Sequence, residues 1–459
     1  MQGRVTAWGS AAAVGMLIAS PTLAQPLAAA DRYEVWAQSE SHLQLFRRAL
    51  LPGPNGAIVS RQTVAPLHQY IRVNARDVDI GSNDDALDVE LAAWGRLWLG
   101  EREDEPAVDG DVQLANARYV HGPFSLRLGR QVVAGGAARY VRFDGAAVEA
   151  ELGTVASALA YGGFTALPRW DARHGYAYLG AAADSDLRHP EVLAALDRDS
   201  HWLAGGRLGL SPASSAQAGV SFHEQRERGG LARRNLGVDA RAKLGPASLA
   251  GSAVMELSQR QIADARVWVD TALSRALDAS VEYLHMQPAL FLSRQSVLSV
   301  FGSDGYHELG GTLLARATER LTFDAGAWAE LYEDDEPGAR AELSTKAALG
   351  RYGRTLLMLT YGRLAAPDNG YHTLRASAAQ RFDAQFSGTV EAYYYWYDEA
   401  IRGYRSSSVY AATVTYHVRD DLSLLWGASL ARSAYASHDA QTQARLTYTF
   451  DFTSRRSEP

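Results

Sequence analysis

The chain has 459 residues, 12 histidines, no cysteine and a formal net charge of −7. Without cysteine, the sequence excludes a disulfide framework and any thiolate-ligated zinc or iron–sulfur centre. The charge is mild and mixed in sign, which gives no electrostatic footprint for nucleic acid. A chain of this length fits several soluble domains, but it fits one large all-β barrel equally well.

Residues 1–24 are organised like a secretory signal peptide. Arg4 supplies a positive charge, the apolar stretch 7–20 follows, and small residues up to Ala24 offer a cleavage site. The apolar stretch is too short to span a bilayer as a stable helix. The alternative is a buried N-terminal helix, but the linker-like AQPLAAADR that follows favours cleavage. We therefore expect the mature protein to leave the cytoplasm, and no cysteine follows the cleavage site to carry a lipid anchor.

From about residue 66 onwards, apolar and polar residues alternate in one segment after another. The clearest examples are DVELAAWGRLWLG (88–100), DARVWVDTAL (264–273) and RLTFDAGAWAEL (320–331). In each, one face holds Ala, Val, Leu or Phe and the other holds charged residues and tryptophan. A period of two predicts β-strands, because successive side chains of a strand point to opposite faces.

Three features favour a membrane barrel over a soluble sandwich. Many runs reach about ten residues, the length that a tilted strand needs to cross a bilayer. Charges lie in strand centres, opposite apolar faces that suit lipid. Short connections also alternate with longer ones, as in outer-membrane barrels. The short connections are 121–123, 152–154, 211–215, 245–247, 351–354, 381–385 and 418–421, and the longer ones include 101–110, 166–200, 288–305 and 333–338.

The sequence therefore predicts an all-β fold: a single closed antiparallel transmembrane β-barrel of about 20 strands, within 18–22, with short periplasmic turns and longer external loops. We place the barrel at residues 66–452. Residues 25–65 form an N-terminal segment that can include the first strand, and residues 453–459 form a periplasmic tail.

The last strand supports this prediction. Leu446, Tyr448, Phe450 and Phe452 alternate with polar residues, so an aromatic face is expected to meet lipid while the strand pairs with the first one to close the barrel. The spacing resembles the terminal recognition signal of outer-membrane barrel proteins, which usually ends in an aromatic residue. Here seven more residues follow Phe452.

The segment FSLRLGRQVVAGGAARYVRFDGAAVEAEL (124–152) has a Gly–Arg–Gln triplet at a strand end, a glycine-rich connection, then an arginine and Phe–Asp–Gly. Gly135 and Gly136 permit a sharp reversal, and a change of phase near Gly145 predicts a β-bulge. The segment resembles large outer-membrane porins of the alginate-export type. That resemblance implies a monomeric barrel whose basic lumen residues guide an anionic polysaccharide outward. Residues 283–311 are similar to porin-like barrels of exopolysaccharide export, but carry over no residue roles.

Charged and aromatic residues on the predicted lumen face are candidates for the solute path. Mixed charges set the field in a pore, arginine binds carboxylates, and tryptophan rings can stack on sugars. The competing interpretation is that they are ordinary solvated or packing residues. The candidates are Arg72, Trp94, Arg96, Arg127, Arg130, Arg139, Arg142, Asp144, Glu149, Glu151, Arg266 and Trp268.

Two function hypotheses remain open. One is a channel that passes polar or anionic saccharides, in the dedicated form an exopolysaccharide export pore, with a periplasmic export component as partner. The other is a non-conducting barrel that acts as anchor, assembly platform or receptor. Either would sit in the bacterial outer membrane, in contact with lipid and lipopolysaccharide; acidic runs at 101–105 and 333–336 could bridge its phosphates through cations, or simply be solvated loops.

Catalysis finds little support. We see no nucleophile elbow, no His-Glu-x-x-His and no P-loop. His189, Asp199 and His201 are the nearest to a rim site, and their spacing specifies no nucleophile and base. We expect no enzyme activity, no cofactor and no metal.

Overall fold

The structure is a computed structural model, and it describes residues 32–50, 60–80, 85–100, 107–166, 201–227, 229–287, 290, 305–332, 336–350, 354–367, 369–401, 403–433 and 438–455. The signal peptide predicted at 1–24, the acidic run at 101–105, and His189 and Asp199 lie outside the described residues. No helix among the described residues is long and apolar enough to cross a membrane.

The described residues form 23 β-strands and one 3₁₀ turn, η1 (Gly136–Ala138). The strands in the first half are β1 (Arg32–Leu50), β2 (Ser60–Val64), β3 (Pro66–Asp79), β4 (Asp85–Trp98), β5 (Val108–His121), β6 (Phe124–Gly135), β7 (Arg139–Leu152), β8 (Ala156–Thr165), β9 (Trp202–Ala213), β10 (Ala216–Glu227) and β11 (Gly230–Leu244). Those in the second half are β12 (Ala247–Glu256), β13 (Gln261–Ser274), β14 (Leu277–Met286), β15 (Tyr306–Thr318), β16 (Leu321–Tyr332), β17 (Pro337–Leu349), β18 (Thr355–Ala365), β19 (Tyr371–Arg381), β20 (Phe386–Ile401), β21 (Tyr404–Arg419), β22 (Leu422–Arg432) and β23 (Asp439–Arg455).

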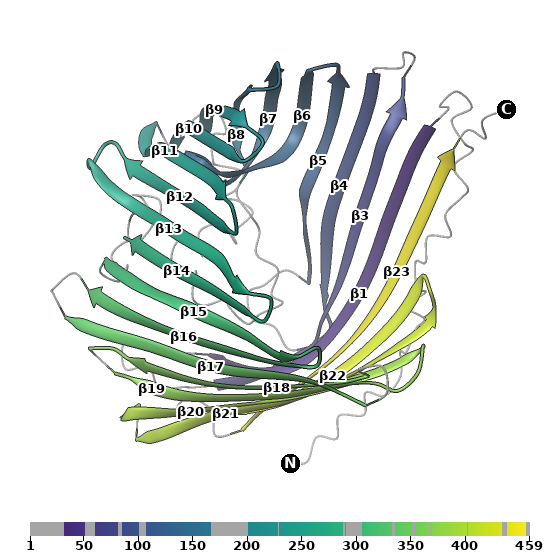
Figure 1. Cartoon of the computed structure of the whole chain (residues 1–459). Helices are drawn as coiled ribbons and strands as arrows, with labels where there is room; N and C mark the ends of the chain where they lie inside the picture. The colour runs from purple at the N-terminus through teal and green to yellow at the C-terminus, as the bar shows by residue number, and fades with distance from the viewer. Residues whose placement is uncertain are drawn as a thin grey trace, which may run out of the picture.

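The strands close into one antiparallel barrel. From β3 to β23 each strand pairs with the next along the chain, and β1 pairs with both β3 and β23, so the first and last strands lie side by side (Figure 1). The short β2 pairs with the end of β1, which leaves 22 strands in the wall and one extra. The predicted closed all-β barrel is confirmed, at the upper limit of the predicted strand number. Its first strand, β1, lies in the segment 25–65, where the sequence allows it, and its last strand ends at Arg455, beyond the expected 452.

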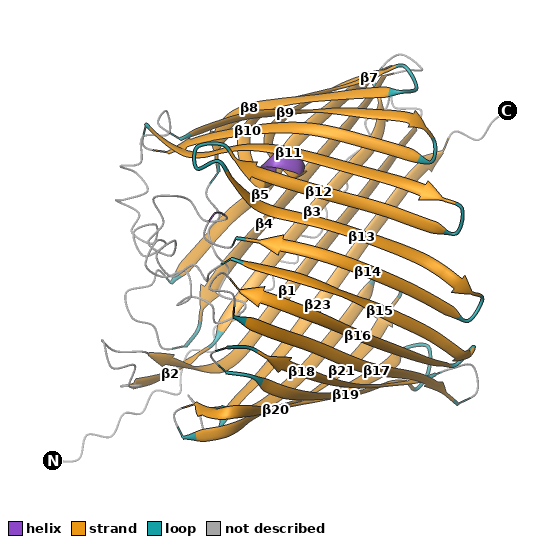
Figure 2. Cartoon of the chain, turned by 60° about the vertical axis from the view of Figure 1, so that its left-hand side comes forward, coloured by secondary structure: helices purple, strands orange, loops and turns teal. Residues whose placement is uncertain are grey.

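The two ends of the barrel differ. Between strands, the connections at 122–123, 153–155, 214–215, 245–246 and 420–421 are short, and all lie at the end where β1 begins and β23 finishes, which we call the turn rim (Figure 2). The long connections, such as 166–201 and 287–305, join strands at the opposite end, the loop rim. The long connections predicted at 166–200 and 288–305 therefore lie at one rim, as expected, but the alternation is not strict, because 228–229 and 402–403 at the same rim are as short as the turns.

The two faces of the wall are chemically distinct. On β3, Ile71 lies outward and is 46 % exposed, whereas the neighbouring inward position His68 is buried. On β13, Val267 and Val269 face outward, and Arg266 with Trp268 face inward. Exposed large apolar side chains recur at such alternate positions around the whole barrel. In water this surface would be a large aggregation-prone patch, so it requires an apolar solvent.

The last strand lets the predicted faces be tested. Phe450 pairs with Ala37 on the outward face and is 40 % exposed, while the preceding Thr449 pairs with Gln38 on the inward face. Because a carboxylate on a lipid-facing strand position costs about 1–3 kcal/mol, depending on depth, Phe450→Asp should reduce the amount of folded barrel in the membrane. Thr449→Asp should be tolerated. The measurement is the heat-modifiable folded fraction on gels, and equal tolerance would contradict the assigned faces.

The β-bulge predicted near Gly145 is wrong. β7 pairs with β6 and β8 without any shift of register. Val141 and Phe143 face inward and are buried, whereas Val148 and Leu152 face outward and are exposed. Apolar residues therefore change face along a regular strand. The half of β7 near the loop rim packs its apolar residues inside the barrel, and the half near the turn rim points them outward.

Candidate functional site: a hairpin folded into the lumen

The hairpin of β6, η1 and β7 departs from the wall on its β5 side. β5 and β6 pair only as far as Ala115 and Arg130, although β5 extends on towards the loop rim to Val108. The separation begins at Gly129, whose φ is +111°. A Cβ atom at Gly129 would clash with the carbonyl oxygen of Ala115, so glycine is required where the hairpin bends away.

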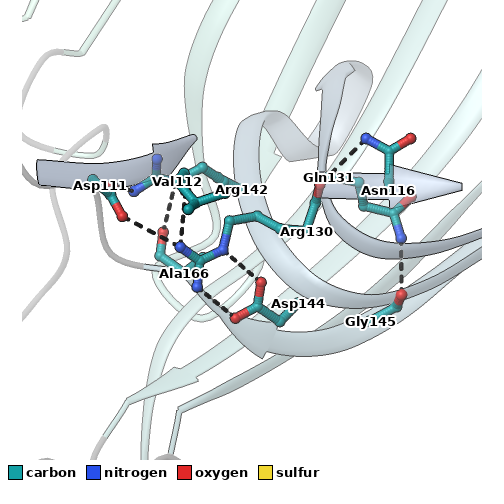
Figure 3. A network of polar contacts seen from close by, with 9 residues as sticks. All are labelled: Asp111, Val112, Asn116, Arg130, Gln131, Arg142, Asp144, Gly145 and Ala166. Carbon is teal, nitrogen blue, oxygen red and sulfur yellow. Dashed lines mark hydrogen bonds and ion pairs between the residues drawn. The ribbon is translucent and has the colours of Figure 1, made fainter. Parts of the chain in front are cut away.

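Two arginines and two aspartates fasten the hairpin to β5 (Figure 3). Arg130 donates two hydrogen bonds to Asp144, at 2.7 and 2.8 Å, and a third to Asp111 at 3.3 Å. Arg142 donates to the other oxygen of Asp111 at 2.8 Å. We call these four residues the clip. Its forked guanidinium contacts fix both direction and distance, and the side chain of Arg142 is only 9 % exposed.

The clip lies between the hairpin and the wall. By register, Arg130, Arg142 and Asp144 project from the face of the hairpin opposite to Gln131 and Phe143. Their partner Asp111 projects inward from β5, opposite Trp94. The upper hairpin therefore lies inside the ring of the other strands.

The tip of the hairpin is attached to the inner face of β10, β11 and β13. The amide of Ala137 donates to Ser221 Oγ at 2.8 Å, and Asn235 Nδ2 donates to the carbonyl oxygen of Ala137 at 3.0 Å. Arg139 forms an ion pair with Asp264. In Figure 2 the purple turn η1 lies behind β11 and β12. These contacts, here called the tip anchors, hold the hairpin at a second point.

The chain reverses at the tip in the way the glycines allow. Gly135 and Gly136 have φ angles of +92° and +55°, as the glycine-rich connection predicts. A Cβ atom at Gly136 would clash with Ser221 Oγ, so the close approach to β10 also requires glycine. Arg139 itself has a φ of +58° and a ψ of −79°, a sparsely populated conformation that costs a residue with a side chain about 1–3 kcal/mol. The ion pair with Asp264 offsets that strain.

An apolar cluster fills the space between the hairpin and the strands beside it. Phe143 is fully buried, its ring centroid lies 5.8 Å from that of Tyr161, and Leu203 and Val141 complete the contact. Tyr161 also forms a hydrogen bond with His223 at 3.1 Å. Burial of a phenylalanine contributes about 2–3 kcal/mol. The hairpin is thus a packed element that narrows the lumen on the side of β7 to β11.

The remaining inner wall carries ion pairs between neighbouring strands. Arg72 pairs with Glu90 at 2.9 Å, Arg118 with Glu149 at 3.2 Å, and Arg266 with Glu282. The side chains of Arg72 and Arg266 are each 52 % exposed although they face inward. The lumen beside them is therefore accessible to water.

A separate aromatic group lies near the loop rim. Arg96 donates to Asp109 at 3.2 Å, and its guanidinium lies 4.7 Å from the ring centroid of Trp98 and 6.0 Å from that of Trp94. All three of these inward side chains on β4 are buried. Their packing holds the loop-rim end of β4 against β5.

The predicted candidates therefore fall into separate places. Arg130, Arg142 and Asp144 meet in the clip, and Arg139 belongs to the tip anchors. The candidates on the wall, where the register places them on the inward face, are Arg72, Trp94, Arg96, Arg127, Glu149, Glu151, Arg266 and Trp268. Sequence reasoning missed the partners Asp111, Ser221, Asn235 and Asp264. No local pattern marks them, because their contacts join distant parts of the chain. Among the described residues, no group of three or more His, Asp or Glu is placed to hold a metal ion.

No family model and no curated protein sequence matches the chain. Among solved structures, it is similar to the outer-membrane protein opdK from Pseudomonas aeruginosa, with 10 % identity and a TM-score of 0.42 over 91 % of this chain and 99 % of that one. It is similar to Pseudomonas aeruginosa OccK9 (OpdG), with 11 % identity and a TM-score of 0.44 over 92 % and 98 %. It is also similar to the P pilus usher (PapC) translocation pore, with 8 % identity and a TM-score of 0.46 over 91 % and 99 %. With scores below 0.5, the assignment of a closed barrel rests on the strand pairing.

Proposed function

We propose that this chain is a bacterial outer-membrane channel that passes polar or anionic saccharides. The observation that carries the proposal is the exposure of inward-facing charged side chains such as Arg72 and Arg266. A wall of 22 strands encloses more space than its own inward side chains fill. The apolar outward face supports a place in the outer membrane after signal-peptide cleavage, with the turn rim in the periplasm and lipopolysaccharide around the loop rim.

The charge pattern suits passage rather than tight binding or catalysis. On the wall, cations and carboxylates alternate across neighbouring strands, as in the pairs of Arg72 with Glu90 and Arg118 with Glu149. Such half-exposed pairs contribute little energy each, so a solute can exchange with them. A channel needs contacts strong enough to admit a solute and weak enough to release it.

The resemblance of residues 124–152 to porins of the alginate-export type extends the proposal to an exported anionic polysaccharide, delivered by a periplasmic export component. The test of this part is the amount of polymer on the cell surface after deletion of the gene, with complementation by the intact chain. Unchanged polymer would confine the proposal to the passage of small solutes.

The channel itself is tested by reconstitution of the folded protein in planar bilayers. We expect steady conductance, and the double variant Arg72→Gln/Arg266→Gln should shift ion preference towards cations, because it removes two positive charges from the water-accessible wall. Arg226→Gln is the matched control, since Arg226 lies on the outward face beside Trp202. A folded barrel that carries no current would favour the alternative of a non-conducting anchor, assembly platform or receptor.

A further inference from the structure

A hollow of about 450 Å³ lies in the inner wall formed by β16 to β20. Its depth follows from the register. The small residues Ser344, Thr360 and Gly362 occupy inward positions in its centre, where Ser344 pairs with Thr360. The large residues Arg375, Tyr393 and Tyr395 lie at inward positions on the next strands, where Arg375 pairs with Tyr393. Short side chains between long ones leave a recess.

The charged groups of this hollow differ from those of the clip. Within the described residues, Asp324, Glu342 and Lys346 line the hollow and make no hydrogen bond or ion pair with another side chain. The guanidinium of Arg375 is only loosely paired, at 3.8 Å from Glu391. These groups are therefore available to a solute, whereas the side chains of Arg130 and Arg142 are occupied by their aspartates.

Two tyrosines at successive inward positions of β20 supply the flat surface. Tyr393 lies beneath the guanidinium of Arg375, which is 4.9 Å from its ring centroid, and its hydroxyl donates to Glu391 at 2.9 Å. Tyr395 packs edge-on against Tyr371, with ring centroids 6.0 Å apart. Each ring is thereby held in one orientation. Fixed aromatic faces beside a few polar groups are a common arrangement in small-molecule sites.

We propose that this hollow is a binding subsite for a single saccharide ring along the channel. The C–H face of the sugar lies on Tyr393 or Tyr395, and its hydroxyl groups donate to the carboxylates of Asp324 and Glu342. Arg375 and Lys346 receive a carboxylate when the sugar carries one. A multiply charged phosphate compound fits less well, because the two carboxylates repel it, and a purely apolar compound leaves four charges unused. The proposal rests on the proposed channel function and deepens it.

The experiment measures how strongly added solutes interrupt the current of the reconstituted channel, with glucose, glucuronate and sorbitol as probes. Sorbitol carries hydroxyl groups on a six-carbon chain, as glucose does, but it has no ring face. We expect glucose to block the current, sorbitol to do so weakly, and Tyr393→Ala/Tyr395→Ala to weaken the block by glucose about tenfold, the scale expected for loss of aromatic contacts. Tyr393→Phe/Tyr395→Phe should retain most of the block.

The control for a general change in the lumen is Trp36→Ala, since Trp36 faces inward on β1, outside the hollow. It should leave the block by glucose unchanged. Lys346→Gln/Arg375→Gln should remove any preference for glucuronate over glucose. Equal block by glucose and sorbitol, or an unchanged block in the alanine variant, would overturn the subsite. If the wild-type protein carries no current at all, the channel function fails instead, and saturation-transfer NMR with glucose on the detergent-solubilised barrel then decides the subsite: contact signals lost in the alanine variant support it, and their absence from the wild type overturns it.

Discussion

Release of the hairpin tip should give a channel with larger and noisier current. Arg139 joins the tip to β13 through Asp264, and its backbone has a strained conformation with positive φ. Arg139→Ala removes the ion pair and allows the tip to move away from the inner wall. Both mean conductance and current fluctuation are therefore expected to rise in single-channel recordings, while the barrel still folds, because strand pairing is untouched.

A double-mutant cycle makes this prediction specific. Asp264→Ala should raise conductance and current fluctuation as much as Arg139→Ala does. The double variant should show no larger rise than either single variant, because both substitutions remove the same interaction. Arg266→Ala is the matched control. Arg266 lies two positions after Asp264 on the same face of β13, and its partner Glu282 is on the neighbouring strand of the wall. It should alter ion preference without added noise. Current in Arg139→Ala that is indistinguishable from wild type would show that the hairpin does not limit conduction.

The barrel was predictable because each wall strand separates two environments. Lipid-type residues on one face and water-type residues on the other impose a period of two, which survives in segments such as 88–100 and 264–273. The lengths of the connections likewise indicate which end of each strand lies at the turn rim and which at the loop rim. The sequence does not settle the first strand, because β1 precedes a segment rich in proline and glycine, and the short β2 pairs only with the end of β1.

The lumen hairpin could be located in the sequence but not placed in space. The pattern of residues 124–152 differs from that of the other strands, and the glycines at its tip correctly predict a reversal. Its contacts, however, join residues far apart in the chain, as between Ala137 and Ser221 or Arg139 and Asp264. Periodicity carries no information about such pairs. For this reason the sequence predicts Arg142 and Asp144 as lumen residues, whereas the structure packs them between the hairpin and β5.

Loss of the clip should destabilise the barrel far more than loss of a wall ion pair. Arg130→Met removes two hydrogen bonds from Asp144 and one from Asp111 in a site where the arginine side chain is 22 % exposed. Breaking a buried pair costs about 3–5 kcal/mol, and partial exposure here reduces the expected loss to about 2–3 kcal/mol. Arg72→Met, which breaks an exposed pair, should cost less than about 1 kcal/mol. The measurement is the urea midpoint of unfolding in detergent micelles.

Further variants of the clip show which interaction causes the loss of stability. If the cost comes from the Asp144 carboxylate left without its arginine, then Arg130→Met/Asp144→Leu should be more stable than Arg130→Met alone, because the second change removes that charge. Arg130→Lys should recover only part of the stability, since an ammonium group cannot fork onto Asp144 while it reaches Asp111. Equal urea midpoints for Arg130→Met and Arg72→Met would mean that the apolar cluster around Phe143, rather than the clip, holds the hairpin in the lumen.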